Sequence, residues 1–160
     1  MDDLTLSFTR TIAASPDAVW RCWTEPDLLR QWFAPAPVEV TLAELDPQPG
    51  GAFRTVMQVP DYGEMAGDPG CVLVAEPAVR LVWTNALGPG FQPNVIGTGE
   101  MDFAFTADIR MASTPDGCQY DVSVLHATRD GAAAHERMGF FTGWGAAADQ
   151  LAVLAASLSS

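Results

Sequence analysis

The chain has 160 residues, of which 48% are apolar, and it carries a formal net charge of −12 at pH 7. This length suits one domain that buries about 70% of its unfolded surface, and the apolar content is that of a globular protein. The acidic surplus would repel phosphate backbones and anionic lipid head groups, and no apolar run is long enough to span a membrane. We therefore predict a single domain over residues 1–160 that binds neither nucleic acid nor membranes.

The N-terminus and the cysteines bear on the cellular compartment. The first residues, MDDLTLSF, are acidic and lack the basic start and long apolar core of a signal peptide. The three cysteines, Cys22, Cys71 and Cys118, are odd in number and far apart in the chain. They are expected to be buried thiols rather than a disulfide framework, as in a cytoplasmic protein.

The N-terminal third predicts one strand and two short helices. Residues 4–12 alternate apolar and polar side chains, which is typical of a half-buried strand. Ser15-Pro16-Asp17 provides an N-cap, a first-turn proline and an acidic residue for a following helix. Thr24-Glu25-Pro26-Asp27 interrupts that helix and starts a second one, which prolines 35 and 37 end.

The central part of the chain predicts a succession of antiparallel strands. Alternating apolar residues place them at about 38–46, 52–59, 71–75, 79–86, 99–111 and 119–126. The last two are joined by Ser113-Thr114-Pro115-Asp116-Gly117, a strong hairpin signal. The segments 60–70 and 87–98 are rich in Gly and Pro and are expected to be loops.

Residues 131–158 predict a long C-terminal helix. The run contains no proline, and its apolar side chains, among them Phe141, Trp144 and Leu151, recur at helical intervals. At about 1.5 Å per residue the helix would be roughly 40 Å long. Three glycines at positions 139, 143 and 145 would each cost about 1 kcal/mol in a helix interior. They indicate either a close approach of another group to the backbone, or a kinked helix that begins nearer Gly143.

This order of elements predicts an α+β protein in which a curved antiparallel sheet of six to seven strands wraps around the C-terminal helix. A curved sheet and a straight helix do not fit closely along their whole length, so an internal cavity can form between them. The side chains expected to line it are mostly large and apolar: Trp32, Phe53, Met57, Trp83, Met101, Phe103, Phe105, Tyr120, His126, Phe141 and Trp144. The same side chains could instead fill the interior, and the pattern leaves both alternatives open.

Several stretches resemble a known family. They are FTRTIAASPDAVWRCWTEPDLLRQWFAP, ELDPQPGGAFRTVM, RLVWTNAL and VLHATRDGAAAHERMGFFTGWGAAADQLAVL, in this order along nearly the whole chain. The chain resembles the START-like superfamily (SRPBCC or Bet v-like), and within it the branch named for the activator of heat-shock-protein ATPase homologue. The resemblance implies a helix-grip fold with a cavity for apolar ligands. Because the superfamily contains binders, carriers, polyketide cyclases or dehydratases and partner-binding domains, it does not imply one chemistry.

The sequence contains few groups that could carry out a reaction. His126 lies on the same predicted strand face as Tyr120 and points toward the helix start, where His135 and Glu136 sit. His126, Tyr120 and Glu136 are therefore the candidate acid–base residues beside an apolar cavity. The stretch HERMG lacks the second His of a zinc motif and the cysteines show no paired spacing, so no metal is predicted. No phosphate-binding or dinucleotide motif is found, and no cofactor is predicted.

Three functions remain open. The favoured hypothesis is binding of a small hydrophobic molecule in the cavity without chemistry. The alternatives are a cyclase- or dehydratase-type enzyme using His126 and Tyr120, and a partner-binding domain that stimulates a chaperone ATPase. An exposed edge strand and the apolar loop around Phe91 would permit a homodimer, although nothing in the sequence requires one.

Overall fold

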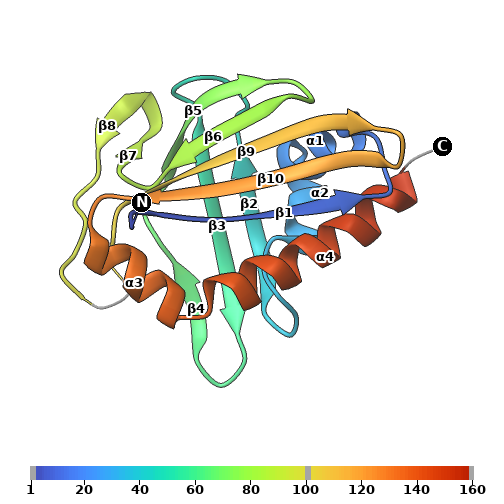
Figure 1. Cartoon of the computed structure of the whole chain (residues 1–160). Helices are drawn as coiled ribbons and strands as arrows, with labels where there is room; N and C mark the ends of the chain where they lie inside the picture. The colour runs from blue at the N-terminus through green and yellow to red at the C-terminus, as the bar shows by residue number, and fades with distance from the viewer. Residues whose placement is uncertain (1–2, 100–101, 159–160) are drawn as a thin grey trace.

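One curled antiparallel sheet and a long helix that lies in its hollow make up most of the protein (Figure 1). The computed structural model describes residues 3–99 and 102–158. Its helices are α1 (Pro16–Thr24), α2 (Pro26–Trp32), α3 (Arg129–Arg137) and α4 (Phe140–Leu158). The main sheet contains β1 (Thr5–Ile12), β2 (Glu39–Leu45), β3 (Ala52–Val59), β4 (Gly63–Ala66), β5 (Gly70–Glu76), β6 (Arg80–Thr84), β9 (Phe105–Thr114) and β10 (Gly117–His126). A small ribbon of β7 (Leu87–Gly88) and β8 (Gln92–Pro93) surrounds a 3₁₀ turn at Pro89–Phe91.

The strand order opens the sheet at one place. The order is β1-β10-β9-β6-β5-β3-β2, and β4 pairs with β3 beside this path. Strand β3 pairs with β5 only through Ala52 and Phe53, and from Val56 onward it pairs with β4 instead. The sheet therefore divides at the middle of β3, and the β3–β4 hairpin extends away from β5 and β6.

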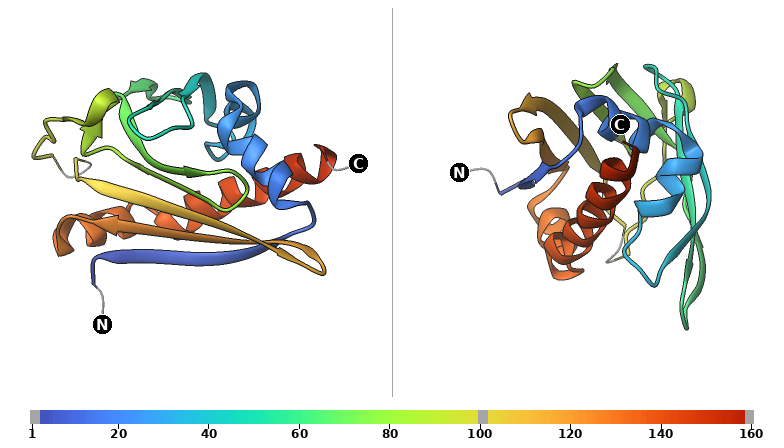
Figure 2. Two further views of the ribbon diagram at one scale, coloured as in Figure 1. Left: turned by 90° about the horizontal axis from the view of Figure 1, so that it is seen from above. Right: turned by 90° about the vertical axis from the view of Figure 1, so that its right-hand side faces the viewer.

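Helices α1 and α2 close one end of the sheet's hollow. Ser15 caps α1 by accepting a hydrogen bond from the backbone N–H of Ala18 at 3.2 Å, and Pro16 occupies the first turn. The end of α2 is fastened to α4 by the side chain of Gln150, which donates to the carbonyls of Trp32 and Ala34 at 3.0 and 2.8 Å. Figure 2 shows α4 inside the curved sheet with α1 and α2 beside its C-terminal part.

The C-terminal helix is broken, unlike the single helix expected from residue 131 onward. Helix α3 ends at Arg137 and α4 starts at Phe140. Gly139 between them has a φ of +93°, a left-handed conformation that favours glycine and ends a helix. The alternative of a kinked helix is thus correct, but the break lies at Gly139 and not near Gly143.

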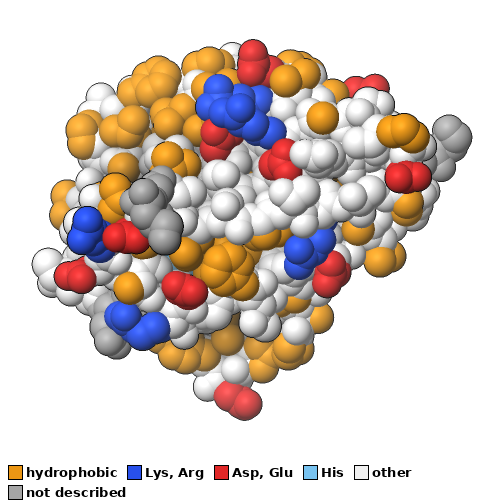
Figure 3. Space-filling model, in the orientation of Figure 1, with side chains coloured by type: hydrophobic (Ala, Val, Ile, Leu, Met, Phe, Trp, Pro, Cys, Tyr) orange, Lys and Arg blue, Asp and Glu red, His pale blue; other side chains and the backbone are white. Residues whose placement is uncertain are grey.

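The predicted α+β helix-grip fold is confirmed, with differences at particular strands. The expected loop at 60–70 contains β4, and the strand expected from residue 99 begins only at Phe105. Of the described helices, none combines the length and the apolar character that a membrane span requires. On the face seen in Figure 3, Arg side chains occur as separate spots, most of them beside acidic groups.

One of these charge clusters links two neighbouring strands, β6 and β9. Asp108 on β9 accepts hydrogen bonds from Arg80 at 3.0 Å and from Arg110 at 3.2 Å. Burial alone would raise the pKa of Asp108, but the two guanidinium groups outweigh it and lower that pKa.

Candidate functional site

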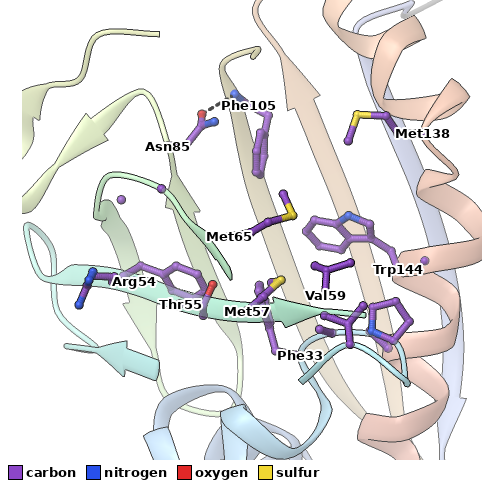
Figure 4. Close-up of a pocket in the computed structure, with 18 of the residues that line it drawn as sticks. Phe33, Arg54, Thr55, Met57, Val59, Met65, Asn85, Phe105, Met138 and Trp144 are labelled. Atoms are coloured by element: carbon purple, nitrogen blue, oxygen red, sulfur yellow. Dashed lines mark hydrogen bonds between the residues drawn. The ribbon is translucent and has the colours of Figure 1, made fainter. Parts of the chain in front are cut away.

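A cavity of about 940 Å³ lies between the sheet and α4 (Figure 4). Its walls come from α2, β3, β4, β6, β9 and the α3–α4 junction. The volume falls within the upper part of the range of small-molecule pockets, roughly 300–1,000 Å³. Of the two alternatives left open by the sequence, a hollow interior and a filled one, the structure has the hollow interior.

Aromatic rings lie nearly parallel along the cavity. The rings of Phe53 and Trp83 stack with centroids 4.1 Å apart and planes 6° apart. The ring of Trp144, on α4, lies 6.5 Å from that of Trp83 and only 10° from its plane. Phe33 contacts both Phe53 and Trp83 edge-on or at a tilt, with centroids 5.6 and 6.3 Å away. The cavity wall is thus built largely from stacked aromatic rings.

The mouth of the cavity lies between the β3–β4 hairpin and the α3–α4 junction. Met57 and Met65 come from the hairpin and Met138 from the junction, and all three border the cavity (Figure 4). Tyr62, at the hairpin tip, is 73% exposed. Methionine side chains are flexible and polarizable, so this rim can adapt to ligands of different shape.

Two histidines meet at the α3 end of the cavity. His126 ends β10, and its Nδ1 lies 2.8 Å from the carbonyl oxygen of Leu4. Its Nε2 lies 2.9 Å from Nδ1 of His135 on α3. His135 lines the cavity, whereas His126 stands behind it. Burial is the main cause that lowers the pKa of His135 to about 4, and repulsion from a proton on His126 would act in the same direction, so the His135 ring is neutral at pH 7.

Tyr120 occupies the opposite, α2 end of the cavity. Its hydroxyl accepts a hydrogen bond from the indole N–H of Trp23 at 3.1 Å, and the residue is fully buried. Burial raises the pKa of Tyr120, even though the hydrogen bond from Trp23 acts in the opposite direction. Tyr120 and His126 are six positions apart along β10, which corresponds to about 20 Å. The structure therefore does not bring these two candidate acid–base groups together.

Glu136, the third candidate acid–base residue, does not join His126 or Tyr120 in a common site. It is exposed on α3 and does not line the cavity. Adjacent helical residues point in different directions, so the burial of His135 turns Glu136 outward. Of the described residues, no group of three or more His, Cys, Asp or Glu side chains is arranged to hold a metal ion.

Most of the predicted cavity residues do line the cavity: Trp32, Phe53, Met57, Trp83, Phe105, Tyr120 and Trp144. Phe103 and His126 do not line it but contact His135, with ring centroids 4.9 and 5.2 Å from it. The prediction for Phe141 is wrong, since this side chain is 45% exposed and Phe140 borders the cavity instead. The break at Gly139 sets the start of α4 and thereby turns Phe140, not Phe141, inward. Met101 lies outside the described residues.

Sequence reasoning missed several groups that border the cavity. Met65 is not predicted to border the cavity because β4 is expected to be a loop. Met138 is not predicted to do so because one continuous helix is expected to run through this position. His135 was placed near His126, but its contact with the cavity was not predicted. The signal for it was present: a His that ends a strand, followed nine residues later by a His in the first helix after it.

A curved sheet that grips a long helix and leaves a large apolar cavity between them defines a helix-grip protein of the START-like class. The sequence pattern of one family in this class matches residues 13–156. The family is described as "Activator of Hsp90 ATPase homolog 1-like protein". This match spans most of the chain, and the protein belongs to this family.

Solved structures with the same fold support the assignment. A protein from Nitrosomonas europaea is 37% identical, with a TM-score of 0.88, 95% of this chain covered and 94% of the other. A protein from Rhodobacter sphaeroides shares 24% identity, with a TM-score of 0.81 and coverages of 98% and 95%. An AHSA1-like protein from Aeromonas hydrophila shares 19% identity, with a TM-score of 0.70 and coverages of 97% and 94%. No curated protein matches the sequence significantly.

Proposed function

We propose that this protein binds one small, flat and largely apolar molecule in the cavity between the sheet and α4. The observation that carries the proposal is the cavity itself, about 940 Å³ with parallel aromatic rings along it. Protein interiors are close-packed, and voids larger than a water molecule are few. A space of this size therefore suits a ligand better than it suits a core.

The lining supports a ligand with aromatic or fused-ring character. Flat rings gain contact area and favourable offset stacking against Phe53, Trp83 and Trp144, whose planes are nearly parallel. The methionines at the mouth tolerate different outlines, so the site favours a class of molecules rather than a single shape.

The two other functions have less support. An enzyme of the cyclase or dehydratase type would need acid–base groups close to one another, and Tyr120, His126 and Glu136 are dispersed over different places. The family name refers to activation of the Hsp90 ATPase, and no contact of the described residues in this chain favours that activity over ligand binding.

Titration with the neutral fluorescent probe N-phenyl-1-naphthylamine tests the proposal. We expect saturable binding of one probe per chain. Trp144→Ala should weaken it about tenfold, because it removes one of the cavity's aromatic faces. Phe141→Ala, on the same helix but exposed, should change the affinity less than twofold. Absence of saturable binding to the unmodified protein, or an equal loss in both variants, would contradict the proposal.

A further inference from the structure

The histidine pair has a defined proton arrangement because one end of it contacts a backbone carbonyl. A carbonyl oxygen can only accept hydrogen bonds, and the Leu4 oxygen lies 2.8 Å from Nδ1 of His126. It also accepts the backbone N–H of His126 at 2.8 Å, which fixes the strand end against β1. Nδ1 of His126 must therefore carry a proton.

The proton on Nδ1 of His126 also determines the hydrogen bond to the second ring. When His126 is neutral, its Nε2 has no proton and accepts a hydrogen bond. The atom facing it at 2.9 Å is Nδ1 of His135, which must then be the donor. In a neutral His135 this leaves Nε2 without a proton, as an acceptor. No described residue forms a hydrogen bond to that atom.

No described residue donates a hydrogen bond to the free nitrogen of His135. Its ring is packed among aromatic side chains with centroids 4.9–6.2 Å away: Phe103, Phe105, Phe140 and Trp144. Because His135 lines the cavity, a molecule inside the cavity can supply the donor for this nitrogen.

We propose that Nε2 of His135 is a hydrogen-bond acceptor for the ligand, and that the ligand carries a hydroxyl or N–H group on its apolar body. This inference rests on the proposed binding function and specifies its ligand class. A neutral acceptor in an apolar wall would favour phenols, alcohols and N–H heterocycles, and would disfavour carboxylates, whose oxygens cannot donate.

The hydrogen-bonded pair of His126 and His135 is better suited to recognising a ligand than to abstracting a proton from it. A base with a pKa of about 4 takes up few protons at neutral pH, so it would be a weak general base. An acceptor that is held by a second ring and a backbone carbonyl has a fixed position and a fixed tautomer. A site built to hydrogen-bond a ligand group discriminates strongly against an analogue that lacks the group.

A pair of matched probes tests the inference. 2-Naphthol and 2-methoxynaphthalene have the same ring system, but only 2-naphthol can donate a hydrogen bond. We define the preference as the dissociation constant of 2-methoxynaphthalene divided by that of 2-naphthol. This preference should be about tenfold smaller in His135→Phe than in the unmodified protein. Affinity for 2-methoxynaphthalene should remain within about threefold in this variant, since Phe keeps an aromatic ring in place. The two probes also differ in hydrophobicity, but this difference affects both proteins equally and cancels when their preferences are compared.

Failure of this inference can be told apart from failure of the proposed function. If N-phenyl-1-naphthylamine binds but the preference is the same in both proteins, the acceptor role is wrong and ligand binding stands. If none of the three probes binds the unmodified protein, both are wrong. Trp144→Ala serves as the control, because it should weaken both naphthalenes to the same extent.

A measurement on the unmodified protein decides the matter if His135→Phe does not fold. Long-range ¹H–¹⁵N NMR of the two imidazoles should show a proton on Nδ1 of each ring and none on either Nε2. Addition of 2-naphthol should shift the Nε2 resonance of His135, and 2-methoxynaphthalene should not. A proton on Nε2 of His135 in the free, neutral protein would overturn the inference.

Discussion

A buried imidazole that has to stay neutral affects the stability of the protein as well as its cavity. The rings around His135 are aromatic, and the one titratable group in contact with it among the described residues is His126. Neither the buried surroundings nor His126 favour a positive charge on His135. Protonation of His135 therefore opposes folding.

The free energy of unfolding should therefore fall as the pH is lowered through the weakly acidic range. The pKa of His135 is lowered from 6.5 to about 4 in the folded state, so the unfolded state binds the proton more tightly. Its contribution is fully present above about pH 6.5, is lost as the pH falls toward 4, and is constant below that. The loss should be on the order of 2–3 kcal/mol. Urea unfolding followed by tryptophan fluorescence at several pH values measures it.

His135→Phe provides the control for this effect. In the variant, the slope of unfolding free energy against pH between about 6.5 and 4.5 should be much smaller. An unchanged slope would mean that other groups cause it. Below that window carboxylates such as Asp108, whose pKa is lowered, contribute in both proteins.

Two buried tryptophans differ in whether their N–H groups are satisfied. Trp23 donates to the hydroxyl of Tyr120, whereas Nε1 of Trp83 has no acceptor among the described residues. Trp23→Phe should therefore destabilise the protein by roughly 1–2 kcal/mol more than Trp83→Phe, because it also breaks a buried hydrogen bond. Both changes remove a similar volume. Equal unfolding free energies for the two variants would show that the Trp23–Tyr120 bond contributes nothing.

At the level of elements, the glycines of the C-terminal region have three different roles. Gly139 ends α3 with a positive φ, Gly143 borders the cavity within α4, and Gly145 lies against Arg10. Sequence periodicity could not separate them, because it gives the same cost to every glycine in a helical pattern. The backbone conformation, which decides the matter, depends on how two helices pack against the sheet.

Gly139→Ala and Gly143→Ala should have opposite effects on stability. A Cβ at either position meets no atom within 4 Å, so only the backbone matters. At Gly139, φ is +93°, and Ala should cost about 1 kcal/mol or more. At Gly143, which is helical, Ala should stabilise by about 0.5–1 kcal/mol. Thermal or urea unfolding compares them. Stabilisation by Gly139→Ala would contradict a left-handed residue at the helix break.

Strand prediction was good where alternation was regular and poor where pairing was local. The hairpin of β9 and β10 followed from two alternating runs and a Pro-Asp-Gly turn. Strand β4 has only four residues, mostly exposed, and is held by its pairing with β3 rather than by an apolar pattern. A segment of this kind has no distinct signal in the sequence, although it forms one side of the cavity mouth.

For the whole molecule, the sequence predicted the architecture but not whether the interior is hollow. Alternation shows which side chains face inward, as it did for Phe53, Trp83 and Phe105. It does not show how far the facing layers are apart. That distance depends on the curvature of the sheet and on the two short helices that hold α4 at one end. These features arise only when distant segments pack together.

The proposed function requires that the interior of this protein holds one small apolar molecule. Native mass spectrometry of the protein purified from its own host, before and after addition of N-phenyl-1-naphthylamine, tests it most directly. We expect one bound small molecule per chain, either carried through purification or supplied by the probe, and its loss on denaturation. A chain of bare mass in both samples would contradict it.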